Sequence, residues 1–220
     1  MFKELRILGA AQVAELRQIA ASANFVDGRI SNPHSKAKHN LQLHDEAAYN
    51  RSSQILTQAL YAHEDFQNFA FPVAMLPPMM ARYTNEMHYG AHADAAFLQL
   101  GAQALRSDLS CTIFLSDPAS YEGGALAIHL GSRTERFKGA AGTAIVYPSD
   151  MLHEVERVTA GERLVAITFV QSRIPDNARR ELLYELNEVA ALEGLGMKPE
   201  NYARLQLVQA NLLRRWGDKP

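Results

Sequence analysis

Several features that would each define a class of protein are missing from this chain of 220 residues. The single cysteine, Cys111, excludes an internal disulfide framework, and its apolar surroundings predict a buried, inert thiol in a protein of a reducing compartment. The formal net charge is only -2, without a block of like charges, so we expect no binding to nucleic acid. No apolar run reaches the length of a membrane span, and no signal core opens the chain. We therefore expect a soluble cytoplasmic protein.

Periodicity in the sequence predicts a mainly β fold with flanking helices. Apolar residues recur at helical spacing over 11–20, 179–192 and 202–216. The segment 25–30 has the pattern of a strand interrupted by a turn. Turn residues separate short strand-like runs, which favours a sandwich or jelly roll over alternating β and α units. We expect one domain over 1–175 and a helical extension over 176–220, which packs on the sheet or on a second subunit. The expected strands cover 82–89, 109–116, 125–130, 143–147 and 162–171.

Two short stretches contain residues that can bind a metal ion. The first, 91–95, contains His92 and Asp94, and the second, 147–153, ends in His153. In a strand, residues two apart project from the same face, so His92 and Asp94 can bind one ion. With a distant histidine they form the two-histidine, one-carboxylate set of non-haem Fe(II) oxygenases, which leaves metal positions open for cosubstrate and oxygen.

A second His-x-Asp pair, His63 and Asp65, follows a run whose apolar residues recur at helical spacing. On a helix, residues two apart point about 200° apart and cannot share a metal. We interpret this pair as a solvated helix end.

The segment 31–44 contains His34, His39 and His44 at five-residue intervals. This spacing matches no common ligand pattern, so a mobile loop near the site is a better interpretation than a second metal site. Lys38 and Asn40 of the same segment are candidates to face a substrate.

Arg163 opens a run, 163–170, that has no other charge and is apolar on both faces. A strand covered on both sides would bury this guanidinium, which would then need an anionic partner. The alternative is an arginine at a strand end that points to solvent or pairs with Glu162 or Glu154. Ten residues after His153, the guanidinium can instead hold the far end of a dicarboxylic acid whose near end chelates the metal.

A set of positions spread over 82–172 forms a recognisable pattern: Arg82-Tyr83, Met87, Tyr89-Gly90, His92, Asp94, Thr112 to Ser116, Gly123-Gly124, Tyr147 to Ser149, Leu152-His153, Gly161, Arg163 and Gln171-Ser172. The chain resembles the Fe(II)/2-oxoglutarate-dependent dioxygenases of the bacterial PKHD-type hydroxylase family, relatives of prolyl 4-hydroxylases. The resemblance implies a double-stranded β-helix, iron bound by His92, Asp94 and His153, and hydroxylation of a substrate with release of succinate and carbon dioxide. It also implies that Arg163 and Tyr83 bind the distal carboxylate of 2-oxoglutarate, with ascorbate as a candidate reductant.

Two positions depart from the family pattern. Glu86 stands where the family usually has glycine, and Phe169 where it usually has tryptophan. Neither removes a ligand, and we expect both to reshape the pocket. Ser110, Thr112 and Tyr147 are candidates to line the pocket or to satisfy backbone groups of the sandwich.

Two other classes of function remain open from the sequence. One is a jelly-roll sensor that binds metal or 2-oxoglutarate without turnover, and the other is a zinc hydrolase that uses the same three ligands. Arg163 at its spacing favours the dioxygenase. The substrate, whether a small molecule or a peptidyl side chain, has no recognisable code in the sequence. A homo-oligomer through the C-terminal helices is also left open.

Overall fold

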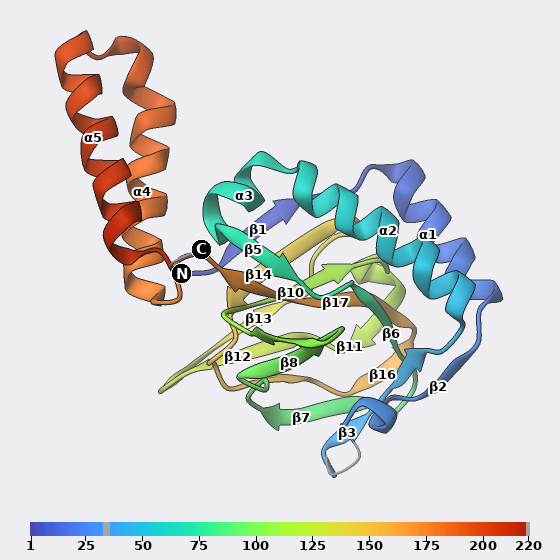
Figure 1. Ribbon diagram of the computed structural model, residues 1–220. Coiled ribbons are helices and arrows are strands. Elements are labelled where there is room, and N and C mark those ends of the chain that lie inside the picture. Colours follow the sequence, from blue (N-terminus) through green and yellow to red (C-terminus); the bar gives the residue numbers. More distant parts are fainter. Residues whose placement is uncertain (33–35, 219–220) are drawn as a thin grey trace.

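The computed structural model describes residues 1–32 and 36–218 and has the expected mainly β architecture (Figure 1). Its strands pair in antiparallel fashion throughout the registers of both main sheets. The larger sheet contains, in spatial order, β1 (Lys3–Arg6), β14 (Thr143–Pro148), β10 (Leu109–Phe114), β17 (Arg163–Ser172), β6 (Met79–Tyr83), β4 (Leu41–Leu43) and β2 (Phe25–Asp27), while β5 (Pro72–Met75) pairs with β17 outside this order.

A second, smaller sheet packs against the larger one and completes the jelly roll. Two short ribbons, β8 (Phe97–Leu100) with β9 (Gln103–Arg106) and β11 (Tyr121–Gly123) with β16 (Val158–Gly161), flank it. The smaller sheet contains, in spatial order, β13 (Arg133–Phe137), β12 (Leu126–Leu130), β15 (His153–Val155), β7 (His88–His92) and β3 (Lys38–His39).

Helices cover the other face of the larger sheet (Figure 1). They are α1 (Ala10–Ser22), α2 (Glu46–Ala62) and α3 (Glu64–Ala70), and their buried apolar residues form one core with that face. Successive side chains of each strand point to opposite faces of the larger sheet. In β10, Leu109, Cys111 and Ile113 join this helical core, so Ser110 and Thr112 face the smaller sheet. Cys111 is buried as expected, and burial raises the pKa of its thiol to about 12.

The expected strand over 82–89 is wrong, because the chain turns within it. β6 ends at Tyr83 and β7 begins at His88, and Glu86 in the intervening turn has a φ of 69°. Glycine adopts this left-handed conformation without strain, which accounts for glycine as the usual residue here. Glu86 is exposed and forms an ion pair with Arg157. Its departure from the family pattern therefore lies in a surface turn.

The expectation of a loop over 31–44 is also wrong in part. β3 and β4 lie in this segment because they pair with β7 and with β2 and β6, and such long-range pairing leaves no signal in local alternation. η1 (Gly28–Ser31) precedes them. His39 and His44 are exposed, and His34 lies outside the described residues.

The other His-x-Asp pair lies between two helices. His63 follows the end of α2, and its ring Nδ1 accepts a hydrogen bond from the backbone N–H of Phe66 in the first turn of α3. Asp65 is exposed in that turn. The interpretation as a helix end is confirmed.

A helical hairpin, α4 (Asn177–Glu193) and α5 (Pro199–Trp216), stands out from the body of the molecule (Figure 1). Only the first half of α4 is anchored, through the buried residues Leu183 and Tyr184, and the Tyr184 ring contacts Phe69 of α3 edge to face. α5 buries no residue completely. The hairpin thus packs on α3 and leaves most of its length away from the sheets. Short 3-10 turns, η2 (Pro118–Ser120) and η3 (Gly194–Gly196), complete the described elements.

Candidate metal centre and cosubstrate pocket

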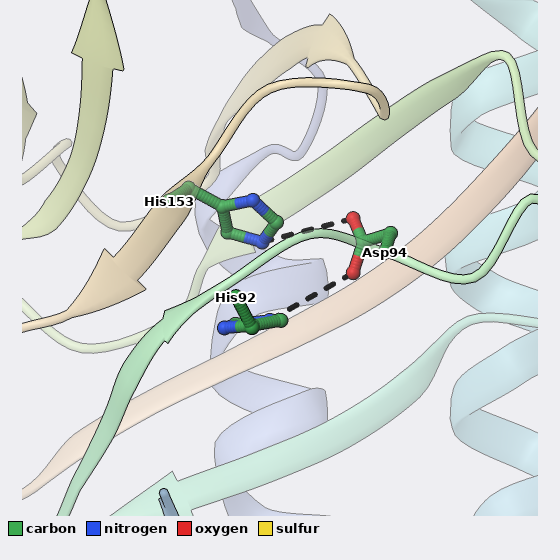
Figure 2. A group of neighbouring side chains, drawn as sticks. All are labelled: His92, Asp94 and His153. Atoms are coloured by element: carbon green, nitrogen blue, oxygen red, sulfur yellow. Dashed lines mark ion pairs between the residues drawn. The ribbon is translucent and has the colours of Figure 1, made fainter.

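His92, Asp94 and His153 converge on one point between the two sheets (Figure 2). Asp94 Oδ1 lies 3.8 Å from His92 Nε2, and Asp94 Oδ2 lies 3.6 Å from His153 Nε2. A divalent ion bonded to three such atoms at roughly 2.1 Å requires them to be about 3 to 4 Å apart. Among residues 1–32 and 36–218, this is the only group of histidine, cysteine and acidic side chains with such an arrangement.

The backbone places these three side chains in a way that strand periodicity describes only partly. His92 is the last residue of β7 and is the register partner of His153 at the start of β15, whereas Asp94 lies just beyond the end of β7. The extended strand pairing brings the two imidazoles together, with ring centroids 4.3 Å apart. The loop after His92 then directs the carboxylate back between them (Figure 2).

Hydrogen bonds on the far side of each imidazole fix its orientation. His92 Nδ1 lies 2.9 Å from the carbonyl oxygen of Gly90, and His153 Nδ1 lies 2.9 Å from that of Met151. A carbonyl only accepts, so each Nδ1 must carry the proton, and each Nε2 lone pair is directed toward the shared point. Burial, together with the neighbouring His153, lowers the pKa of His92 and favours this neutral form.

A chain of serine hydroxyls supports Asp94. Ser110 Oγ donates to Asp94 Oδ2 at 2.6 Å and lies 2.7 Å from Ser149 Oγ, which accepts from Ser107 Oγ at 2.8 Å. A hydroxyl that donates to one carboxylate oxygen holds the carboxylate in a single orientation and leaves the other oxygen available to a metal.

Replacing Ser110 with alanine is expected to weaken Fe(II) binding about 10- to 100-fold, the range typical for loss of a group that hydrogen-bonds to a metal ligand. Asp94 would keep its charge but lose the group that orients it. Equilibrium dialysis against Fe(II) without oxygen measures the effect. Ser107→Ala, which removes the hydroxyl at the far end of the same chain, is the matched control and should change the affinity much less. Equal iron affinity in wild type and Ser110→Ala would contradict this role for Ser110.

Arg163 lies in the same interior, next to Tyr83 across the β17–β6 register. Its side chain is 1% exposed, and its guanidinium carbon lies 4.9 Å from the centroid of the Tyr83 ring. Among the described residues, Nε and Nη1 have no hydrogen-bond partner. The alternatives raised by the sequence are wrong, because the side chain is buried, Glu162 pairs with Arg82, and Glu154 pairs with His129.

One cavity of about 300 Å³ joins the convergent ligands to Arg163. Burial raises the pKa of Tyr83, so its phenol stays protonated and can donate a hydrogen bond. Arginine remains a cation at any ordinary pH, although burial lowers its pKa. The donor set therefore fits a ferrous ion, and the two unpaired guanidinium nitrogens fit a carboxylate that enters the cavity. The lining includes Lys38, Tyr83, Tyr89, His92, Asp94, Ser110, Thr112, Leu126, Tyr147, His153, Arg163, Ile167 and Phe169.

Most of the remaining candidate residues lie at the cavity, and one lies at the surface. Ser110, Thr112 and Tyr147 all line the cavity, as does Phe169, so the second departure from the family pattern does lie at the pocket. Glu86 is absent from the described lining, and the expectation that it reshapes the pocket is wrong, since its turn lies at the surface.

Tyr89 is one of the positions that match the family, but the sequence assigned it no role; its ring stacks on His92 with centroids 3.6 Å apart. Residues three apart fall on opposite faces of a regular strand. The register, however, shifts between the pairs His153–His92 and Val155–Tyr89, so that β7 has one extra residue. This bulge brings Tyr89 to the face of His92. No pattern in a single sequence indicates such a bulge.

The comparisons with known proteins agree with this fold and place the chain in a family. Residues 78–171 match the 2OG-Fe(II) oxygenase superfamily. A PKHD-type hydroxylase of Sphingopyxis alaskensis is 62% identical over 216 residues, which cover 98% of this chain and 99% of that protein.

Two solved structures share the fold at low identity. A prolyl hydroxylase of Trichoplax adhaerens, solved with a hypoxia inducible factor peptide, has a TM-score of 0.60 at 14% identity and covers 77% of this chain and 83% of its own. HygX of Streptomyces hygroscopicus, solved with nickel, 2-oxoglutarate and hygromycin B, has a TM-score of 0.53 at 16% identity and covers 78% and 82%.

Fold and site together define the class as the 2OG-Fe(II) oxygenases, whose jelly roll this chain shares. Within that class, the chain is 62% identical to the PKHD-type hydroxylase of Sphingopyxis alaskensis over nearly the full length of both proteins, whereas its identity to the Trichoplax adhaerens structure is 14%. The chain belongs to the PKHD-type hydroxylase family.

Proposed function

We propose that this protein is an Fe(II)- and 2-oxoglutarate-dependent hydroxylase in which His92, Asp94 and His153 bind the metal. The observation that carries the proposal is the buried guanidinium of Arg163, whose Nε and Nη1 have no partner among the described residues and which opens on the same cavity as the three convergent side chains. A buried unpaired cation is costly, so this arrangement calls for an anion between Arg163 and the metal site.

The residues of the site would each have a defined task. When bound, Fe(II) and 2-oxoglutarate would supply the oxidative chemistry, in which one oxygen atom of O2 enters succinate as 2-oxoglutarate loses carbon dioxide and the other converts a substrate C–H group to C–OH. Arg163 would bind the distal carboxylate in a bidentate manner, and the phenol of Tyr83 would donate to the same group. Apolar walls from Leu126, Ile167 and Phe169 would exclude water from the reacting centre.

Formation of succinate tests this function directly. Wild-type protein supplied with Fe(II), 2-oxoglutarate and air should form succinate and carbon dioxide, slowly without substrate and faster with it. The sensor interpretation predicts binding of 2-oxoglutarate without succinate, and the zinc hydrolase interpretation predicts neither. Absence of succinate from iron-loaded protein that binds 2-oxoglutarate would contradict the proposed hydroxylase.

The biological setting is proposed from general features of the chain. In the described residues no helix is long and apolar enough to cross a membrane, and the only cysteine is a buried free thiol. These features support a cytoplasmic, reducing location. Ascorbate is a suitable reductant there, because the reaction needs iron in the ferrous state. The substrate would be a small molecule or a peptidyl side chain, and the net charge of -2 argues against nucleic acid.

We also propose that the α4–α5 hairpin pairs with a second copy of the chain and takes no part in the chemistry. Both of its helices expose large apolar residues away from the rest of the fold, and single chains rarely leave such residues clustered on one projection. They are Leu182, Val189 and Leu192 of α4 and Leu207 and Val208 of α5, and Leu195 of the connecting turn η3 is exposed as well.

Truncation after Pro175 is expected to lower stability and to reduce the oligomer to a monomer, with the metal ligands unaffected. The loss of Leu183 and Tyr184 from the surface of α3 should cost about 2 to 5 kcal/mol for each buried side chain. Thermal unfolding and light scattering measure the two effects. Leu207→Ser, at an exposed position of α5, should change only the oligomer. A folded truncated protein that keeps its oligomeric state but no longer binds Fe(II) would contradict this role.

A further inference from the structure

Lys38, which the sequence offers as a candidate to face a substrate, lies on the wall of the metal cavity but has no part in binding the metal or the cosubstrate as proposed above. Its side chain belongs to β3 of the smaller sheet, is 8% exposed, and donates from Nζ to Ser31 Oγ at 2.7 Å. The ammonium lies 5.4 Å from the centroid of the Tyr89 ring, and Tyr89 stacks on His92. Lys38 is thus separated from a metal ligand by a single aromatic ring.

The ammonium of Lys38 is incompletely paired within the described chain. A lysine offers three N–H donors, and the hydroxyl of Ser31 accepts only one of them. No carboxylate of the described residues lies within ion-pair distance of Nζ; Asp27 and Asp94 act on it only from farther away. Burial lowers the pKa of Lys38, and these two more distant carboxylates oppose that shift.

If the site is loaded with Fe(II) and 2-oxoglutarate, as the proposed function requires, its charges balance without Lys38. Ferrous iron and Arg163 contribute positive charge, and Asp94 and the two carboxylates of 2-oxoglutarate balance it in full. The charge of Lys38 is left over. Because an isolated buried ammonium is strongly disfavoured, a further anion would stabilise the loaded cavity.

We propose that Lys38 binds a carboxylate of the primary substrate, which makes the substrate an acid. The two cations of the cavity come from opposite sheets, Arg163 from β17 and Lys38 from β3. In this assignment Arg163 holds the cosubstrate and Lys38 holds the substrate, and both side chains line the cavity that contains the metal ligands. The carboxylate belongs either to a small free acid or to an acidic side chain in a peptide, since both offer the same oxygens to Nζ.

Calorimetric titration of protein loaded with Mn(II) and 2-oxoglutarate, without oxygen, tests this assignment. Two probe pairs distinguish the sources: N-acetylglycine against its primary amide, and an acetylated, amidated Gly-Asp-Gly peptide against Gly-Asn-Gly. In wild type, the acid of one pair should bind at least about tenfold more tightly than its neutral partner, as expected for a charge-assisted hydrogen bond. The pair that shows the preference identifies the source.

Three variants complete the experiment. Lys38→Met should abolish the preference while binding 2-oxoglutarate as wild type does, and Lys38→Arg should retain it. Lys36→Met makes the same change of charge at an exposed neighbouring position and should leave the preference intact. The proposal is overturned if neither acid is preferred in wild type, if the preference survives in Lys38→Met, or if that variant loses affinity for 2-oxoglutarate, which would assign Lys38 to the cosubstrate. Failure of wild type to bind 2-oxoglutarate at all would instead refute the proposed function.

Discussion

Replacing Asp94 with alanine is expected to remove Fe(II) binding and, with it, all succinate formation above background. Asp94 is the one anion of the convergent group, and its two oxygens lie 3.8 and 3.6 Å from the Nε2 atoms of His92 and His153. Two neutral imidazoles alone bind a ferrous ion weakly. The loss of affinity should exceed the roughly 10- to 100-fold cost of losing a group that only hydrogen-bonds to a metal ligand. Equilibrium dialysis without oxygen and a succinate assay measure the two effects.

The other His-x-Asp pair offers a matched control for this experiment. Asp65→Ala removes a carboxylate with the same sequence relation to a histidine, but from the exposed first turn of α3. Iron binding and succinate formation should stay at wild-type levels. Thermal unfolding of both metal-free variants shows whether the fold survives. A folded Asp94→Ala protein with wild-type iron affinity would mean that the metal binds elsewhere.

The two His-x-Asp pairs also show how far local periodicity can be used. The pattern around His63 predicts a helix, and the structure has helices on both sides of it. The pattern around His92 predicts an extended chain, and β7 does end at this residue. In both cases the spacing of apolar side chains along the local sequence distinguishes a helix from an extended chain, so the type of element can be predicted from it.

Long-range pairing explains most of what the sequence could not predict. The bulge that places Tyr89 on His92 exists because β7 pairs with β15, about sixty residues away, with one residue in excess. Ser110 reaches Asp94 because β10 lies in the opposite sheet. β3 brings Lys38 to the cavity by pairing with β7. Each of these contacts depends on a register between distant strands, which composition and periodicity do not specify.

Glu86 shows a different limit. The sequence identifies it as a departure from a family pattern, and departures near a site suggest a change in the pocket. The structure gives a backbone reason instead, a positive φ of 69° in the turn between β6 and β7. Glycine has no Cβ and adopts this conformation freely, whereas glutamate has to be held there. The ion pair with Arg157 and the hydrogen bond from the Glu86 N–H to the carbonyl of Val158 hold it.

Replacing Arg163 with methionine or alanine is expected to weaken 2-oxoglutarate binding by a few kcal/mol, the value of a charge-assisted bidentate pair, and to leave Fe(II) binding nearly unchanged. Two nitrogens of the guanidinium, Nε and Nη1, have no hydrogen-bond partner among the described residues, and the side chain is 1% exposed, so no internal ion pair is lost with it. Methionine keeps most of the volume and limits the cavity that alanine would leave. Tyr83→Phe should show the same effect, only smaller.

Arg82 provides the matched control, because it is the neighbour of Tyr83 in β6 but pairs with Glu162 on the outer side of the sheet. Arg82→Ala should bind 2-oxoglutarate as wild type does, although removal of its contacts with the Phe25 ring and the Ala20 carbonyl should lower the thermal midpoint. Titration of 2-oxoglutarate into protein loaded with Mn(II) separates the two arginines. Equal 2-oxoglutarate affinity in wild type and in both Arg163 variants would show that the anion binds elsewhere. The buried guanidinium would then need another partner, because its burial next to Tyr83 without an anion stabilises nothing.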